Sequence, residues 1–135
     1  MSAFNDRVIA EFRANGGVVS GFGNRLVLLH STGARTGEAR VNPALSVVAG
    51  ADRLIIASAR GAESNPGWYF NLKAHPDVSI EDGRTASPID VSARELTGED
   101  YAAARREFDR MSASFEEYQR TAGSRLLPIF RLTPR

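Results

Sequence analysis

The chain contains no cysteine among its 135 residues. Disulfide bonds, thiolate nucleophiles and cysteine-based zinc sites are therefore excluded. The longest apolar runs, Leu26 to Leu29 and Leu54 to Ala57, are far shorter than the roughly 20 residues of a membrane-spanning helix. The N-terminal segment carries charges and has no continuous apolar stretch, so it does not resemble a signal peptide. These absences predict a cytoplasmic protein without an integral membrane segment.

The chain also has little net charge and almost no lysine. Its formal net charge of +1 gives no reason to expect nucleic acid as a partner. Lys73 is the only lysine among 17 basic residues, so the other 16 are arginines. The codon bias of a GC-rich genome would explain this preference. Alternatively, a few arginines bind an anion, because a guanidinium group matches the geometry of carboxylates and phosphates.

Length and hydrophobic spacing predict a single α+β domain over residues 1–135. Helical spacing of apolar residues predicts helices over residues 4–12, 66–74, 98–111 and 114–122. Apolar runs and alternation predict strands over residues 25–30, 39–48, 53–58, 78–81, 84–88, 89–96 and 126–132. Antiparallel strands with helices inserted late in the chain indicate a barrel rather than an alternating βαβ sheet.

Local motifs set the expected boundaries of these elements. Asn65 precedes a proline and is expected to cap the second helix. Thr97 with Asp100, and Ser114 with Glu117, have the spacing of capping boxes for the third and fourth helices. The dipeptide at 82–83, Asp-Gly, predicts a tight hairpin turn between strands 78–81 and 84–88.

Three polar or aromatic segments are candidates for ligand binding. Residues 31–40, STGARTGEAR, combine exposed backbone N–H groups, hydroxyls and two arginines, which suits an anion. Residues 57–61, ASARG, are small enough for a flat ligand to approach the backbone. Residues 65–72, NPGWYFNL, place Trp68 and Asn71 where they can line a pocket. Each segment also has a plain structural reading, as a solvated hairpin tip, a tight turn and a core helix respectively.

Other catalytic patterns are weak. His30 and His75 lack partners at metal-ligand spacing, and no metal site is expected. No Gly-x-Ser-x-Gly nucleophile motif is present. Phe115 and Tyr118 lie one helical turn apart and can face the same cleft, where the tyrosine could donate a proton to a substrate. A core or dimer-interface role for Tyr118 fits the sequence equally well.

Taken together, three segments resemble the deazaflavin-dependent nitroreductase family, whose members use coenzyme F(420) and are typical of actinobacteria. They are residues 28–37, LLHSTGARTG; residues 40–43, RVNP; and residues 65–76, NPGWYFNLKAHP. The resemblance continues from residue 12 to the end of the chain. Each motif alone is unspecific, but their order and spacing together are specific.

The resemblance implies a split β-barrel related to flavin-mononucleotide-binding oxidoreductases, usually dimeric, and hydride transfer to a quinone, nitroaromatic or conjugated lactone. It implies that Arg35, Thr36 and Arg40 hold the phosphate and acidic tail of the cofactor. The expected border of the deazaflavin ring comprises Asn42, Pro43, Ala44, Leu45, Ala57, Ser58, Ala59, Arg60, Gly67, Trp68 and Asn71. Ser58, by hydrogen bonding to the ring, and Tyr118, by positioning or protonating the acceptor, are the expected catalytic residues. The acceptor pocket is expected to be apolar, with Phe115 and parts of the first helix near it.

Two departures from the family pattern concern the acidic tail. The family commonly has Ala-Ser-Lys-Gly-Gly after the third strand, so the basic residue here, Arg60, is displaced by one position. The family position before the loop arginine is often basic, whereas here it is Ala34. Both changes predict a lower affinity for the acidic tail of the cofactor. The short N-terminal segment weakens the case for peripheral membrane contact without closing it.

Two alternatives remain open from the sequence. One is a flavin-mononucleotide-dependent oxidoreductase on the same fold. The other is a non-catalytic protein that binds deazaflavin, haem or a fatty acid.

Overall fold

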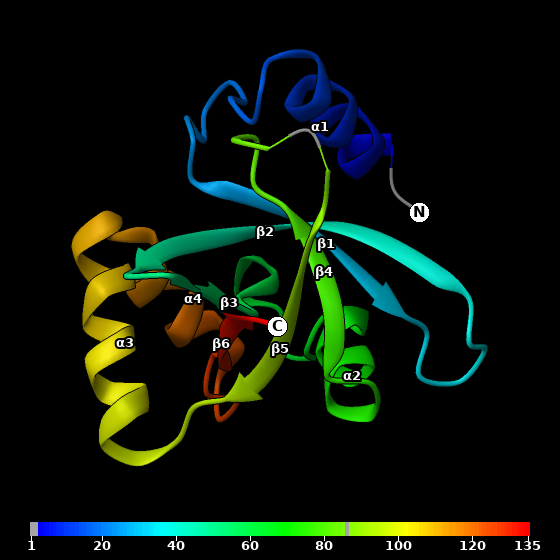
Figure 1. The fold of residues 1–135 in the computed structure, drawn as a ribbon. Coiled ribbons are helices and arrows are strands. Elements are labelled where there is room, and N and C mark those ends of the chain that lie inside the picture. Colours follow the sequence, from blue (N-terminus) through cyan, green and yellow to red (C-terminus); the bar gives the residue numbers. More distant parts are fainter. Residues whose placement is uncertain (1–2, 86) are drawn as a thin grey trace.

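The computed structural model describes residues 3–85 and 87–135, and six strands in this part of the chain form a closed antiparallel barrel (Figure 1). The order around the barrel is β1-β2-β3-β6-β5-β4, and pairing of β1 with β4 closes it. The bounds are β1 Leu26–Thr32, β2 Ala39–Ala49, β3 Asp52–Ile56, β4 Asp77–Glu81, β5 Ile89–Glu95 and β6 Ile129–Pro134. The predicted α+β split barrel is therefore confirmed.

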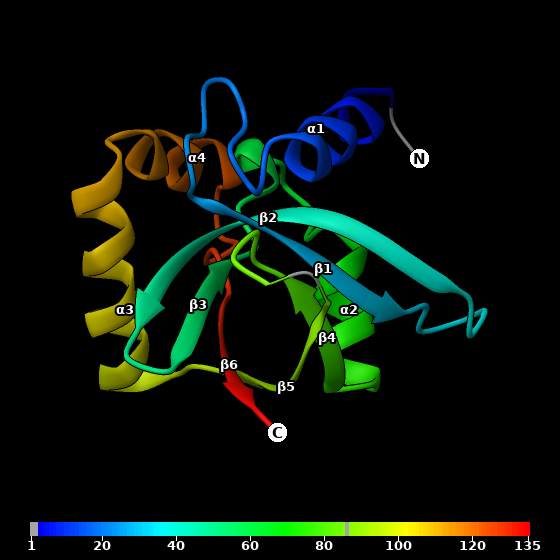
Figure 2. The ribbon, with the colours of Figure 1, turned by 45° about the horizontal axis from the view of Figure 1, so that its top comes forward.

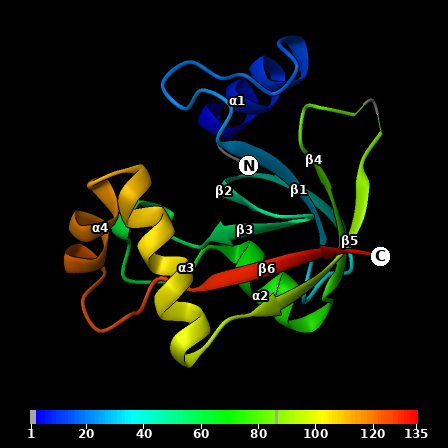
Figure 3. The same cartoon turned by 60° about the vertical axis from the view of Figure 1, so that its left-hand side comes forward.

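Helices surround the barrel on three sides. Figures 2 and 3 show α1 above it, α3 and α4 together against one side, and α2 against another. The bounds are α1 Ala3–Ala14, α2 Gly67–Ala74, α3 Gly98–Met111 and α4 Ser114–Ala122, with a 3₁₀ turn, η1, at Ala59–Gly61. No helix of the described residues is long and apolar enough to cross a membrane.

Apolar side chains form one cluster inside the barrel and two outside it. The interior cluster includes Val27, Leu29 and Ile55, all fully buried. A second cluster lies under α3 and α4 around Phe108, and a third lies under α1 around Phe12. Alternation in β2 separates these layers, because Ala44 points into the barrel while Leu45 packs outside against the helices.

Several strand boundaries differ from the predicted ones. β1 continues through Thr32, because residues 31 and 32 pair with β2, so the hairpin loop begins at Gly33. β3 ends at Ile56 and β6 begins at Ile129, each shorter than predicted. The predicted strand 84–88 is wrong for its described residues, since β5 begins at Ile89; residue 86 lies outside the described residues.

The loop after β4 is shaped by a close backbone approach. Gly83 has φ of 81°, as a turn there requires. A Cβ on Gly83 would lie 2.5 Å from the carbonyl oxygen of Gly16, at the end of α1. The Asp82 carboxylate accepts a hydrogen bond from the Arg84 backbone N–H at 2.9 Å. The loop therefore bends toward α1 instead of closing as a two-residue hairpin.

The predicted side-chain caps do not form. Thr97 occupies the N-cap position of α3 with extended backbone, but its hydroxyl makes no capping hydrogen bond. Ala113 is the N-cap of α4, and the Ser112 hydroxyl accepts from the Ser114 N–H instead. Pro66 is the N-cap of α2, and the Asn65 side chain accepts a hydrogen bond from Arg125.

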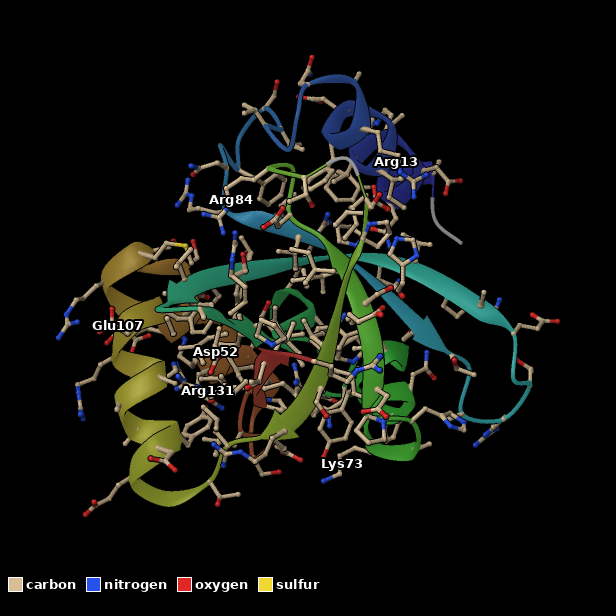
Figure 4. The ribbon with its side chains drawn as sticks, viewed as in Figure 1. Arg13, Asp52, Lys73, Arg84, Glu107 and Arg131 are labelled. Carbon is tan, nitrogen blue, oxygen red and sulfur yellow. The ribbon has the colours of Figure 1, made fainter. Side chains whose placement is uncertain are left out.

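A small ionic cluster ties the end of α1 to the barrel. Arg13, labelled in Figure 4, donates two hydrogen bonds to the Glu81 carboxylate, at 2.7 and 3.2 Å. His30 Nε2 lies 2.6 Å from the same carboxylate. Hydrogen bonds from Arg13 are the largest cause that holds the pKa of Glu81 below its ordinary value.

We expect Glu81→Gln to flatten the acid dependence of stability. Because the folded pKa is lowered, the carboxylate stabilises the fold fully above the unfolded pKa of about 4.3 and loses that effect as pH falls through the folded value. At neutral pH the variant should lose only about 0.5–1 kcal/mol, since the Arg13 side chain is 51% exposed. Urea unfolding at several pH values measures this, with Glu116→Gln on the exposed face of α4 as control. An acid profile parallel to that of the wild type would contradict it.

Candidate functional site

A cavity of about 1290 Å³ opens between α1, the β1–β2 loop, the middle of β2, the turn after β3, α2 and α4. Its lining residues come from parts of the chain that extend from Phe4 to Tyr118. Almost all predicted site residues line it: Arg35, Thr36, Arg40, Asn42, Pro43, Ala44, Leu45, Ser58, Ala59, Arg60, Gly67, Trp68, Asn71 and Tyr118. The structure thus brings the three sequence motifs to one place.

Ala57 is the exception among the predicted residues. It is fully buried and belongs to the interior cluster of the barrel. Its N–H donates to the Pro128 carbonyl at 2.8 Å, which extends the pairing beyond the end of β3. Ala57 is thus part of the barrel wall, and its place at the border of a ligand stays a prediction.

The charged side chains of the cavity are all positive. Arg35, Arg40 and Arg60 line it, and no carboxylate does so among the residues that the structure describes. Arg40 shares an exposed ion pair with Glu38 at 3.1 Å, whereas Arg35 forms none with any residue that the structure describes. A cavity with three guanidinium groups and no carboxylate on its wall attracts a ligand with several negative charges.

Two hydroxyl groups in the cavity make no hydrogen bond to any residue in the described ranges, 3–85 and 87–135. They belong to Ser58, which is 9% exposed, and to Tyr118 on α4. Both can therefore donate to a bound molecule.

Asn71 has a different task, because its amide is already used. Its Oδ1 accepts from the Ala34 N–H at 2.9 Å, and its Nδ2 donates to the Ser31 hydroxyl at 3.2 Å. These bonds join α2 to the β1–β2 loop. Asn71 thus fixes the loop that carries Arg35, besides lining the cavity.

The turn after β3 has an uncommon backbone. Ala59 and Arg60 have φ of 46° and 54°, in the left-handed region that residues with a Cβ seldom adopt. Such conformations cost about 1–3 kcal/mol each and need support from their surroundings. The Arg60 guanidinium lies over the Phe4 ring of α1, 4.3 Å from its centroid, as a cation–π contact. The displaced arginine is thus engaged by α1.

Helix α4 packs directly on this turn. A Cβ on Gly61 would lie 2.8 Å from the Tyr118 Cα and would overlap the Thr121 hydroxyl. That hydroxyl donates to the Gly61 carbonyl at 2.8 Å. The close approach holds Tyr118 in a fixed place relative to Ser58 and Arg60.

Arg125 is the residue that supports the turn, and sequence analysis missed it. Its guanidinium donates to the carbonyls of Ala57, Ser58 and Ala62 at 2.8–2.9 Å, and to Asn65 Oδ1 at 2.7 Å. Burial lowers the pKa of Arg125. Hydrogen bonds to backbone carbonyls leave no sequence pattern, so nothing in the segment 123–128 could have pointed to this role.

The cavity wall also differs from expectation on its apolar side. Phe4, Val8, Phe22 and Leu26 line it, so the first helix does contribute. Phe115 does not line it, since this side chain is only 1% exposed and packs edge-on against Phe108. It nevertheless lies beside the lining, because its ring packs edge-on against that of Tyr118, with 6.0 Å between the two centroids.

The sequence model of the F(420)H(2)-dependent quinone reductase family matches residues 5–134. The chain belongs to this family. It is 34% identical over 109 residues to an F(420)H(2)-dependent quinone reductase of Mycobacterium tuberculosis, covering 81% of this chain and 73% of that protein. The resemblance noted in the sequence is confirmed.

Solved structures agree with this assignment. A structure described as an F(420)-H(2)-dependent reductase, FDR-A, has 36% sequence identity and a TM-score of 0.71, covering 80% of this chain and 93% of the other. A structure described as a domain-swapped dimer has 33% identity and a TM-score of 0.73, covering 94% and 92%. The protein is thus an oxidoreductase of a family whose cofactor is coenzyme F(420).

The residues that line the cavity match the chemical groups of this cofactor. Coenzyme F(420) combines a flat deazaflavin ring with a phosphodiester and an oligoglutamate tail. The positive lining by Arg35, Arg40 and Arg60 suits the anionic part, and the apolar walls with Ser58 suit the ring.

We expect Arg125→Lys to destabilise the fold and the site together. An ammonium group keeps the charge, but its donors radiate from one nitrogen and cannot reach four oxygens at once. The free energy of unfolding should fall by about 2 kcal/mol, and affinity for F(420) should fall with it. Urea unfolding and a fluorescence titration measure the two effects, with the exposed Arg106→Lys as control. Unchanged stability would show that the four bonds contribute nothing.

Proposed function

We propose that this protein reduces a quinone with F(420)H(2), and that residues 1–135 carry the whole site as one split-barrel domain. The observation that carries this proposal is the wall of the 1290 Å³ cavity, with three arginines and no carboxylate among its described residues. When bound, the reduced deazaflavin supplies a hydride. A quinone that accepts a hydride needs one proton more to become a quinol, so the protein must admit or donate that proton.

The β1–β2 loop is the proposed anion-binding element. Arg35 in the loop and Arg40 at the start of β2 offer guanidinium donors to this part of the cavity. Thr36 shapes the loop, because its hydroxyl accepts from the Glu38 N–H at 3.2 Å. We assign these three residues to the phosphate and the acidic tail.

The middle of the cavity is the proposed place of the ring. Asn42, Pro43, Ala44 and Leu45 come from β2, and Ala59, Gly67 and Trp68 come from the turn and α2. Gly67 leaves open space, since a Cβ there would meet nothing within 4 Å. Ser58 would hydrogen-bond the ring through its free hydroxyl. Arg60 adds positive charge beside it while its guanidinium stays on Phe4.

The apolar end is the proposed acceptor pocket. Phe4, Val8, Phe22 and Leu26 offer a surface suited to a flat apolar molecule such as a quinone. We assign Tyr118 to orienting the acceptor and to donating the one proton that must accompany the hydride.

Assembly and location are also part of the proposal. The domain-swapped dimer among the similar structures supports a homodimer. A cytoplasmic location stays a prediction from the sequence.

The function is tested by mixing the protein with F(420)H(2) and menadione, and following reoxidation of the deazaflavin by its absorbance. We expect turnover that depends on both compounds and saturates with each. Absence of both binding and turnover would overturn the proposal. Binding without turnover across quinones, nitroaromatics and conjugated lactones would favour a carrier instead.

Arg35→Ala should weaken F(420) binding by about 1.5–3 kcal/mol, the range for hydrogen bonds to charged groups. The loss should shrink at high salt, because the interaction is ionic and partly exposed. Titrations at low and high ionic strength measure it, with the exposed Arg94→Ala on β5 as a charge-matched control. An unchanged dissociation constant would mean that Arg35 is merely solvated.

Tyr118→Phe tests proton donation separately from binding. If the hydroxyl protonates the acceptor, kcat should fall about 100-fold, while affinity for F(420) stays the same. Tyr69→Phe serves as control, because its hydroxyl lies outside the cavity and contacts Glu95 at 3.4 Å. Normal turnover of the Tyr118 variant would leave solvent as the proton source.

A further inference from the structure

A second cavity of about 650 Å³ lies apart from the first and shares no lining residue with it. Its walls come from the segment after α1, the end of β2, the start of β3, the β4–β5 loop and the end of α3. Figure 4 shows Arg84 on the loop side and Glu107 on α3. Nothing in the proposed reductase activity uses this place.

Positive charge exceeds negative charge around this cavity. Its charged lining consists of four arginines and two carboxylates: Arg25, Arg53, Arg84, Arg110, Asp82 and Glu107. Glu107 pairs with Arg110 on the exposed surface of α3. The Arg25 guanidinium donates to the Phe22 carbonyl at 3.1 Å and forms no ion pair within the described part of the chain. The excess is therefore two positive charges, concentrated near Arg25, Arg53 and Arg84.

Arg53 and Arg84 share one carboxylate. Asp82, whose side chain is 4% exposed, lies 3.4 Å from the Arg53 guanidinium and 3.3 Å from that of Arg84. Burial would raise the pKa of Asp82, but hydrogen bonds from Arg84 and the charge of Arg53 hold this pKa below the ordinary value. Asp82 is thus ionised. Its single negative charge balances one of the two positive charges of Arg53 and Arg84, so one positive charge remains.

The buried Arg53 is poorly satisfied. The residue is 9% exposed, and its two hydrogen bonds are long: 3.4 Å to Asp82 and 3.5 Å to the Ser46 hydroxyl. Charge-assisted bonds between guanidinium and carboxylate are ordinarily about 2.7–2.9 Å. Burial and the neighbouring charge of Arg84 lower its pKa, against the opposing charge of Asp82. No fully buried polar atom of the described side chains lacks a partner, so the remaining Arg53 donors are accessible and can bind an acceptor that enters the cavity.

Apolar side chains stand at the edge of this charged pocket. Val18 and Val48 are 51% and 54% exposed, which is high for large apolar residues. Val47 and Met111 also line the cavity. A ligand that covers them would carry an apolar group next to its charge.

We propose that this second cavity binds a phosphate monoester with a small apolar substituent, its phosphate between Arg25, Arg53 and Arg84. A phosphate monoester carries about 1.5–2 negative charges at neutral pH, which matches the excess of two positive charges. Its oxygens can occupy the donors that Arg53 leaves open, and its alkyl or aryl group can cover Val18 and Val48. The proposal does not depend on the reductase function.

The test is a titration of butyl phosphate into the isotopically labelled protein, followed by the backbone amide signals in NMR spectra at low ionic strength. We expect saturable shifts at Val48, Arg53 and Arg84. Arg84→Gln should weaken this binding about tenfold or more, the loss of a charged hydrogen bond. Arg106→Gln removes the same charge from α3 outside the cavity and should leave the affinity unchanged.

A second variant and a second ligand test whether the arginines and the double charge of the phosphate are responsible for binding. Arg53→Gln should reduce the affinity more than Arg84→Gln, and Arg84→Gln alone decides the question if the buried variant does not fold. Butyrate should bind at least several-fold more weakly than butyl phosphate, since it carries a single charge. Shifts confined to residues 33–37 of the first cavity, equal binding of butyrate, or no saturable shift would each overturn the proposal.

Discussion

The site depends on one guanidinium that organises a strained turn. Arg125 gathers the carbonyls of Ala57, Ser58 and Ala62 and the side chain of Asn65, so the chain from β3 to α2 follows a single path. That path includes two left-handed residues, which an unsupported turn would avoid. Because α4 packs on Gly61, the same support fixes the helix that carries Tyr118. An interaction outside the cavity thus sets the positions of groups inside it.

The positive charge of the cavity also comes from several elements of the fold. Its three arginines come from a hairpin loop, a strand and a turn, and no carboxylate of the described residues lines the wall beside them. Arg60 contacts Phe4 of α1, so the positive end and the apolar end of the cavity meet at one cation–π pair. The first helix, anchored by Arg13 to Glu81, is therefore part of the site as well as of the fold.

The sequence predicted the barrel, its helices and the family because apolar periodicity and motif order are local or near-local signals. It predicted Arg35, Ser58 and Trp68 as cavity residues because they lie in those motifs. It did not predict that Ala57 and Phe115 are buried outside the cavity lining, because the direction of these side chains depends on how the barrel and the helices pack. Its predictions of side-chain caps at Thr97 and Ser114 were wrong. The Thr97 hydroxyl makes no capping hydrogen bond, and Ala113 takes the N-cap position of α4. Arg125 was beyond its reach, since its partners are backbone atoms of a distant turn.

The central claim is that the arginine-lined cavity selects the anionic deazaflavin. The most direct measurement is a binding titration that compares F(420), flavin mononucleotide and the deazaflavin riboside without phosphate or glutamates, at low and high salt. F(420) should bind most tightly, at least about tenfold more tightly than the riboside, and this difference in affinity should narrow as salt screens the arginines. Tighter binding of flavin mononucleotide, or equal binding of F(420) and the riboside at low salt, would contradict it.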